Sequence, residues 1–324
     1  MMRALSLPFL LFLSLLASPA VALPLHTECV APAKPGGGFD LTCQLLKQTL
    51  LVSGAVPSEM QVRYMPGGIG AVAYDRAVTQ RWSDPGVFIA FSTGSLLNLV
   101  QGKFGPHGTS DVRWLATLGT EYGVVAVRKD SRLTSLPALV QRLRENAGGA
   151  VFGAGGTVGS QDWIKASLLV RAAGRDHRTM RFISFEGGGQ AISALRGGHV
   201  DVFCGDAGEA MSALAAGDIR LLAVLAPRRQ QGVLAQVPTA REQGVDLIWP
   251  TVRGIYMGPG VSDKDHDEWS RLLSRVMETP AYQRAARAAG LEPMKLEGQQ
   301  LRNWIQGEAQ RMRDLALSLH LAVR

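Results

Sequence analysis

Glycine-rich turns are the feature that most constrains the fold of this 324-residue chain. They lie at residues 35–38, 66–70, 153–159 and 187–189, and at least three of them join a short apolar run to an amphipathic one. Apolar runs that alternate with amphipathic runs are typical of an α/β protein with largely parallel sheets. The sequence therefore predicts strands that pass through glycine turns into helices.

A strand-to-helix turn is also a natural seat for an anion. Backbone N–H groups at the start of a helix lack intrahelical partners and carry the positive end of the helix dipole, and glycine lets a ligand approach them closely. The sequence contains no GxSxG, Walker or HExxH motif and no CxxC pair. The turn at 153–159 has the spacing GxGxxxG, which does not match a dinucleotide-binding motif. We predict a protein that holds an anion, with no catalytic residue, no cofactor and no metal.

The first residues predict export. Arg3 precedes an apolar run over 5–16 and the segment Ala20-Val21-Ala22, which together are typical of a signal peptide over residues 1–22 that is cleaved after Ala22. The alternative, a membrane anchor, needs about 20 apolar residues, more than this run supplies.

The formal net charge of +7 fits an anionic ligand but does not establish one. Its arginines are dispersed along the chain and are not interleaved with clustered aromatic residues, so we do not expect nucleic-acid binding. We expect a monomer.

Two of the three cysteines, Cys29 and Cys43, lie in the first expected strand and about one turn into the helix after it. They either form a disulfide, which would stabilise the fold by about 3 kcal/mol in the chain-entropy model, or remain two buried thiols. Cys204 lies in an apolar stretch and is expected in the core.

A chain of this length predicts two domains. The helix-rich C-terminal stretch follows an expected strand at 251–257, so it can return to the first domain. We expect one lobe over residues 23–122 and 252–324 and a second lobe over 123–251, with the ligand between the carboxyl ends of their two sheets.

Several motifs in order carry a family resemblance. They are APAKPGGGFD at 31–40, PGGIG at 66–70, SFEGGG at 184–189 and GGHVD at 197–201. This series resembles the tripartite tricarboxylate transporter receptor family, also called the Bug proteins. The resemblance implies a periplasmic solute-binding protein with a two-lobe Venus-flytrap fold of type II-like form, which delivers a small carboxylate to the membrane permease of a tripartite tricarboxylate transporter.

The resemblance also implies that the first strand-to-helix turn and the turns of the second lobe bind a ligand carboxylate directly or through water. The candidate ligand-binding residues are Gly36, Gly37, Gly38, Phe39, Asp40, Thr93, Gly94, Ser95, Gly156, Thr157, Gly159, Ser160, Gly187, Gly188 and Gly189.

Several candidates have an alternative role. Phe39 either closes over the ligand or anchors its helix in the core. Asp40 caps the helix, holds a bridging water or pairs with Lys34, because a carboxylate beside an anion is repulsive. Glu186 is expected to orient a neighbour, and Arg253 to neutralise ligand charge, to make a hinge contact or, the more ordinary case, to lie at the surface.

The amino-acid sequence of the first motif most resembles the tricarboxylate-binding branch of the family, so citrate is the expected ligand. Asp162 stands where many relatives have histidine, and ligand identity is therefore not carried over from those relatives. Two other functions fit the same sequence: an extracytoplasmic carboxylate sensor subunit and an exported enzyme acting on a small organic acid.

Overall fold

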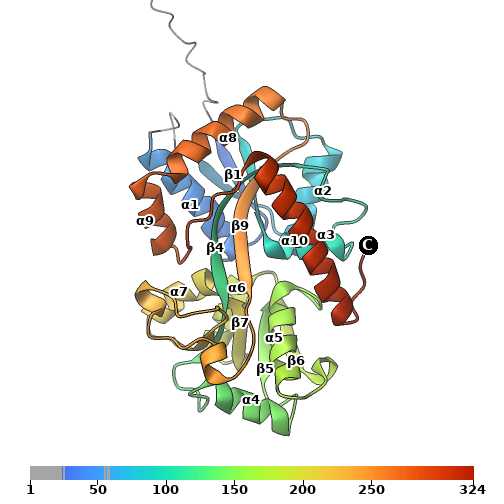
Figure 1. Ribbon diagram of the computed structural model, residues 1–324, viewed down its shortest axis with the longest axis vertical. Coiled ribbons are helices and arrows are strands. Elements are labelled where there is room, and N and C mark those ends of the chain that lie inside the picture. The colour runs from blue at the N-terminus through green and yellow to red at the C-terminus, as the bar shows by residue number, and fades with distance from the viewer. Residues whose placement is uncertain (1–23, 25, 55, 57–58) are drawn as a thin grey trace, which may run out of the picture.

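The computed structural model describes residues 24, 26–54, 56 and 59–324, so the expected signal peptide lies outside the described residues. The described chain forms two lobes joined by two long strands (Figure 1). None of the helices in this part of the chain combines the length and the apolar character that crossing a membrane requires.

The first lobe is built on a sheet with strand order β2-β1-β3-β9-β4. Its strands are β1 (Glu28–Ala31), β2 (Gln61–Tyr64), β3 (Val87–Ser92), β9 (Pro250–Met257) and the first part of β4 (Arg113–Arg128). Strands β1, β2 and β3 are parallel, and β9 runs antiparallel to β3. The helices of this lobe are α1 (Gly38–Val52), α2 (Ala71–Thr79), α3 (Thr93–Val100), α8 (Asp263–Met277), α9 (Pro280–Ala288) and α10 (Gly298–Ser318).

The second lobe carries its own sheet, with β5 (Val151–Gly155) between β6 (Arg181–Phe185) and β7 (Val202–Asp206) in parallel. The second part of β4 pairs antiparallel with β7 and with β8 (Ile219–Val224). Its helices are α4 (Leu136–Glu145), α5 (Gln161–Ala172), α6 (Gly188–Arg196) and α7 (Ala207–Ala215).

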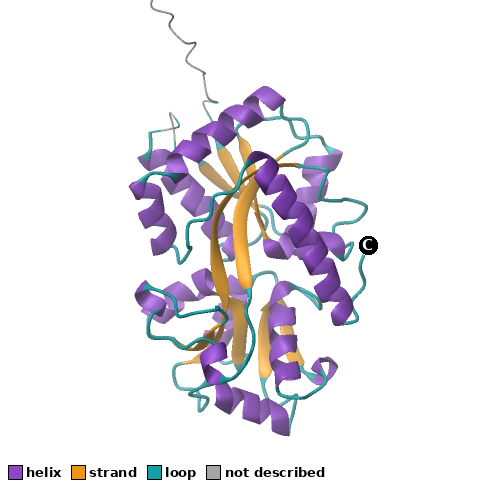
Figure 2. Ribbon diagram, in the orientation of Figure 1, coloured by secondary structure: helices purple, strands orange, loops and turns teal. Residues whose placement is uncertain are grey.

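Strands β4 and β9 connect the lobes and run antiparallel to each other (Figure 2). Residues 113–122 of β4 pair with β9, and residues 123–128 pair with β7 and β8. The α/β two-lobe fold is confirmed, but the expectation of largely parallel sheets is only half right. One chain that crosses to a second lobe and returns must cross in opposite directions, which adds antiparallel pairs to each sheet.

Each lobe has its own hydrophobic core. In the first, Phe88 of β3 packs edge-on against Trp269 of α8, with 4.8 Å between the ring centroids. In the second, the side chains of α4 and α5 surround the buried Phe152 of β5. The C-terminal half of α10, through Met312 and Ala316, belongs to that second core, so this helix extends along both lobes (Figure 1).

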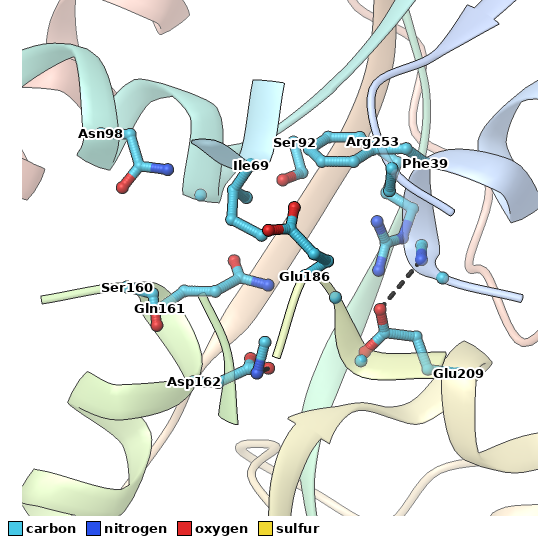
Figure 3. Close-up of a pocket in the computed structure, with 17 residues that line it drawn as sticks. Phe39, Ile69, Ser92, Asn98, Ser160, Gln161, Asp162, Glu186, Glu209 and Arg253 are labelled. Atoms are coloured by element: carbon cyan, nitrogen blue, oxygen red, sulfur yellow. Dashed lines mark hydrogen bonds between the residues drawn. The ribbon is translucent and has the colours of Figure 1, made fainter. Parts of the chain in front are cut away.

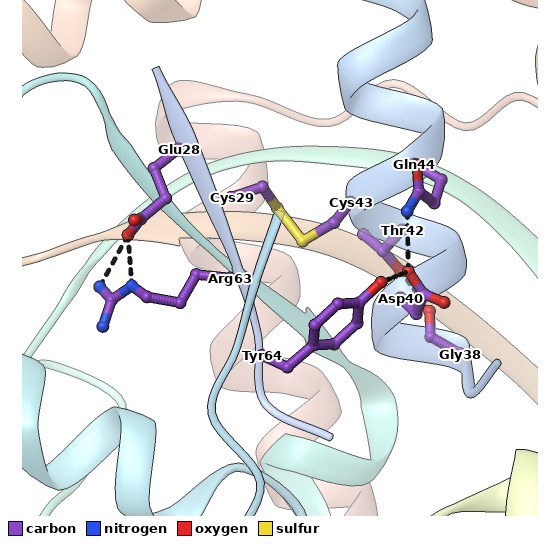
Figure 4. Close-up of a disulfide and its surroundings, with 9 residues drawn as sticks. All are labelled: Glu28, Cys29, Gly38, Asp40, Thr42, Cys43, Gln44, Arg63 and Tyr64. Atoms are coloured by element: carbon purple, nitrogen blue, oxygen red, sulfur yellow. Dashed lines mark hydrogen bonds and ion pairs between the residues drawn. A yellow bond between two sulfur atoms is a disulfide. The ribbon is translucent and has the colours of Figure 1, made fainter. Parts of the chain in front are cut away.

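A disulfide joins Cys29 of β1 to Cys43 of α1, with 5.5 Å between the Cα atoms (Figure 4). It fixes the strand and the helix on either side of the first glycine turn. Cys204 is a buried free thiol in β7.

Candidate functional site

A cavity lies where the two lobes meet, at the glycine turns of both (Figure 3). This inner chamber has a volume of about 40 Å³, which is room for a few water-sized groups and not for a whole organic acid. Its lining comes from both lobes: Ala33, Gly37, Gly38, Phe39, Ile69, Ser92, Gly94, Asn98 and Arg253 from the first, and Gly155, Ser160, Gln161, Asp162, Glu186, Gly187, Gly188 and Glu209 from the second.

An outer chamber of about 480 Å³ adjoins the inner one, and Ile69, Asn98, Ser160 and Glu186 line both. Hydroxyl and amide donors line it, from Thr157, Ser160, Ser184, Asn98 and Gln190. It also holds a cation, Lys103, whose Nζ donates to the Val158 carbonyl oxygen across the lobe boundary at 2.6 Å. Burial lowers the pKa of Lys103 to about 8, because removing the ammonium group from water disfavours its charge.

The structure brings nine of the predicted residues to these two chambers: Gly37, Gly38, Phe39, Gly94, Gly156, Thr157, Ser160, Gly187 and Gly188. It places the other six, which are Gly36, Asp40, Thr93, Ser95, Gly159 and Gly189, away from the lining. The ligand role of all fifteen stays a prediction.

The six residues outside the lining have structural roles of two kinds. Asp40 supports the first turn by accepting a hydrogen bond from Gly36 N at 2.7 Å. It also accepts one from Tyr64 Oη at 2.9 Å (Figure 4). Thr93 accepts from the backbone of β9, and Ser95 completes the capping box of α3. The glycines permit turns or close contacts: Gly36 and Gly159 have positive φ, and Gly189 packs against the Gly36 backbone.

A buried ion cluster adjoins the inner chamber, and we define it as Glu121, Asp162, Lys165, Asp206 and Arg253. None of the five is more than 3% exposed. Lys165 of α5 pairs with Asp206 at 2.7 Å and with Asp162 at 2.9 Å. Arg253 of β9 donates to Glu121 through Nε and to Asp206 through Nη2, the latter at 2.9 Å. Arg253 therefore connects β9 to Glu121 of β4 and to Asp206 of β7 inside the protein, and the expectation that it lies at the surface is wrong.

Ion pairing and burial act in opposite directions on the carboxyl groups of this cluster. The two neighbouring carboxylates raise the pKa of Lys165 despite its burial. Lys165 and Arg253 together lower the pKa of Asp206, whereas burial raises the pKa of Glu121 and of Asp162. Each carboxylate also accepts a hydrogen bond from a backbone amide or a hydroxyl, as buried charges require.

Glu209 connects the two lobes at the chamber. It is the N3 residue of α7, where Oε2 accepts from Asp206 N in a capping box. Its other oxygen, Oε1, accepts from Gly38 N at the start of α1 in the opposite lobe, at 2.9 Å (Figure 3). This contact requires glycine at positions 38 and 188. A Cβ on Gly188 would collide with the Glu209 carboxylate, and a Cβ on Gly38 would collide with the Arg253 guanidinium.

Sequence reasoning missed Glu121, Lys165, Asp206 and Glu209. Two signals were available. The pattern Asp206-Ala-Gly-Glu209 at the end of an apolar strand is a capping box, and Lys165 is a cation between apolar neighbours in its helix. Neither signal reveals that the groups meet, because they come from four different elements.

Among the described residues no group of three or more His, Cys, Asp or Glu side chains is arranged to hold a metal ion. The carboxylates of the ion cluster instead pair with lysine and arginine.

The fold is shared with solved structures. MatC of Rhodopseudomonas palustris, solved with bound malate, is 22% identical with a TM-score of 0.75, covering 90% of this chain and 98% of that one. Rpa4515 of R. palustris, solved with adipate, is 20% identical with a TM-score of 0.81, covering 92% and 98%. These likenesses establish the two-lobe architecture.

Sequence comparison identifies the family. Protein BugT of Bordetella pertussis is 25% identical over 289 residues, which is 88% of this chain and 86% of that protein. The family model for the tripartite tricarboxylate transporter family receptor matches residues 89–321, which include both crossing strands and most of the chamber lining. Members of this family are solute-binding receptors and not enzymes. The chain belongs to the tripartite tricarboxylate transporter receptor family.

Proposed function

We propose that the protein is a periplasmic receptor that closes on a small carboxylate and delivers it to the membrane permease of a tripartite tricarboxylate transporter. The observation that most supports this proposal is the pair of adjoining chambers at the lobe boundary. The N-termini of α1, α5 and α6 approach these chambers from both lobes. Helix N-termini favour a carboxylate by unpaired N–H groups and by the helix dipole. The related MatC and Rpa4515 were solved with malate and adipate, which supports the same ligand class here.

The carboxylate fits the outer chamber best. The ammonium of Lys103 and the hydroxyl groups of Thr157 and Ser160 line it, and its volume of about 480 Å³ admits a small organic acid. A carboxylate oxygen accepts several hydrogen bonds at once, so a set of convergent donors is the arrangement it needs.

We further propose that the lobes move about the two crossing strands, at residues 122–123 of β4 and 251–252 of β9. Thr93 Oγ1 accepts from Val252 N at 2.9 Å at one of these points. Contacts that would break on opening include Lys103 to Val158 and Gln101 to Gly159, each a side chain of one lobe on a carbonyl of the other, and Glu209 to Gly38 N.

Citrate is the ligand that the sequence motifs favour, and it is the first compound to test. The carboxylates that line the inner chamber weigh against a third negative charge in the closed cleft. A sensor role would use the same cleft, and nothing in the described structure favours it over transport.

The test is thermal unfolding of the purified protein with citrate, malate and adipate, each at low millimolar concentration. A ligand that binds only the folded state stabilises it by RT ln(1 + [L]/Kd), so the midpoint rises as the ligand concentration exceeds the Kd. We expect at least one acid to raise it, and Thr157→Ala to reduce the effect. Thr134→Ala, an exposed threonine outside both chambers, is the matched control and should leave the effect unchanged. No shift with any carboxylate would refute the proposal.

A further inference from the structure

The position expected for a ligand carboxylate is occupied by a side chain of the protein itself. Glu209 reaches from α7 to Gly38 N, the first amide of α1, and passes directly beside Gly188 at the start of α6. These are the two opposed turns that a bridging ligand would join. In this arrangement a ligand carboxylate meets a carboxylate, and not a free backbone amide, at that point of the chamber.

The surroundings of Glu209 are acidic. Glu209 and the ion cluster together contain four carboxylates and two cations, and both cations already pair with carboxylates of the cluster. Burial and the neighbouring Asp206 and Asp162 raise the pKa of Glu209 to about 8, and Arg253 opposes that shift only in part. Glu186, at the entry to α6, adds another carboxylate to the lining of both chambers.

An unused hydrogen-bond acceptor faces the same chamber. Gln161 donates through Nε2 to Asp206 at 2.8 Å, which fixes its amide, while Oε1 is buried and has no hydrogen-bond partner among the described residues. The unpaired oxygen lies beside Gly94 in the inner chamber. A buried acceptor without a donor is costly, so a ligand that supplies an N–H group there gives Gln161 Oε1 a bond that the described residues do not.

We propose that the cleft selects a small carboxylate that also carries an ammonium group, and that Glu209 is the residue that determines this specificity. This inference rests on the proposed function and names its substrate class. The ammonium group lies in the inner chamber against Glu209 and Gln161, and the carboxylate lies in the outer chamber toward Lys103.

The dimensions agree with this orientation. The inner chamber, at about 40 Å³, admits one end of a ligand, and the outer chamber, at about 480 Å³, takes the rest. The acceptors Glu209 and Gln161 lie at the inner end, whereas the cation Lys103 and the hydroxyl of Thr157 lie at the outer end. A zwitterion matches both ends, and a dicarboxylate matches only the outer one.

The experiment is calorimetric titration with matched pairs of compounds: succinate against 4-aminobutyrate, and adipate against 6-aminohexanoate. Each pair has the same chain length and differs by one carboxylate replaced by an aminomethyl group. We expect the wild-type protein to prefer the amino acid of a pair by roughly tenfold or more, as a desolvated charge pair provides. Glu209→Gln keeps an acceptor oxygen for Gly38 N but removes the charge, and it should reduce that preference to below about threefold. Glu145→Gln, an exposed glutamate of α4, is the control and should leave the preference unchanged.

Proton release gives a second readout that does not depend on a variant. A bound ammonium group stabilises the ionised Glu209 carboxylate, so binding at pH 7 should release a proton, measured as a dependence of the binding heat on the ionisation heat of the buffer. Equal or tighter binding of the dicarboxylates, or proton uptake, would overturn the inference and leave the proposed function intact. If neither these compounds nor citrate and malate bind, the proposed function fails and the inference fails with it.

Discussion

Gly38→Ala is the substitution that most sharply tests the geometry of the cleft. An added Cβ at this position would fall within the guanidinium group of Arg253. Arg253 has no simple way to withdraw, because Glu121 and Asp206 hold it on two sides. Gly37, one residue earlier, is the matched control: the nearest atom to its added Cβ is 3.8 Å away, and its φ of −93° suits alanine.

The expected cost follows from the pairing of Arg253. Breaking a buried ion pair by displacing one partner costs about 3–5 kcal/mol. Alanine in place of glycine in a helix returns about 0.5–1 kcal/mol. We therefore expect Gly38→Ala to lower the free energy of unfolding by about 2–4 kcal/mol, a large share of the ~5–15 kcal/mol of a typical protein. Gly37→Ala should change it by less than about 1 kcal/mol.

Urea unfolding followed by tryptophan fluorescence measures both variants, with the midpoint compared at constant slope. The separate lobes need a second probe, such as circular dichroism, to show that both report one transition. If Gly38→Ala unfolds at the same urea concentration as Gly37→Ala, the Arg253 guanidinium does not lie against this turn, and the reasoning is refuted.

Three further predictions concern the ion cluster, the disulfide and Glu209. Lys165→Met leaves two buried carboxylates without their lysine and should lower the free energy of unfolding in urea by about 3–5 kcal/mol. The exposed control Lys264→Met should change it by less than about 0.5 kcal/mol. Equal effects of the two variants would contradict the ion cluster. The double variant Cys29→Ser/Cys43→Ser should lose about 3 kcal/mol, the chain-entropy value for a 15-residue loop, and an unchanged melting temperature would show that the bond adds no stability. The pKa of Glu209 in the folded protein is raised to about 8, so its contribution to stability is complete below its ordinary pKa near 4.5 and is lost as the pH rises to 8. Glu209→Gln should therefore flatten the plot of stability against pH in this range. A plot as steep as that of the wild type would disprove the shift.

Much of the fold could be predicted from local patterns. The apolar residues of Leu136–Glu145 follow the helical spacing that α4 adopts, and the glycine turns do join strands to helices. Strand β4 is hard to recognise from the sequence, because Gly119 and Gly123 interrupt the strand pattern. Tertiary contacts explain both glycines, because neither position has room for a side chain. Gly119 lies against the backbone of Glu292, and Gly123 lies against the side chain of Lys165.

The candidate site was predictable only in its turns. The glycines of the lining were found because a strand-to-helix turn has a local signature, whereas the charged groups beside them meet only in the folded protein. Glu121 and Arg253 are 132 residues apart, and Glu209 and Gly38 are 171 residues apart. Charge complementarity over such separations leaves no local pattern in the sequence, so the acidic character of the inner chamber emerged only from the structure.

A crystal structure of the protein with a ligand found by thermal unfolding would test the central claim most directly. The account predicts one molecule at the lobe boundary, with a carboxylate within hydrogen-bond distance of Lys103 or the 156–160 turn and its other end toward Glu209. A ligand held elsewhere on the surface, with both chambers filled only by water, would contradict it.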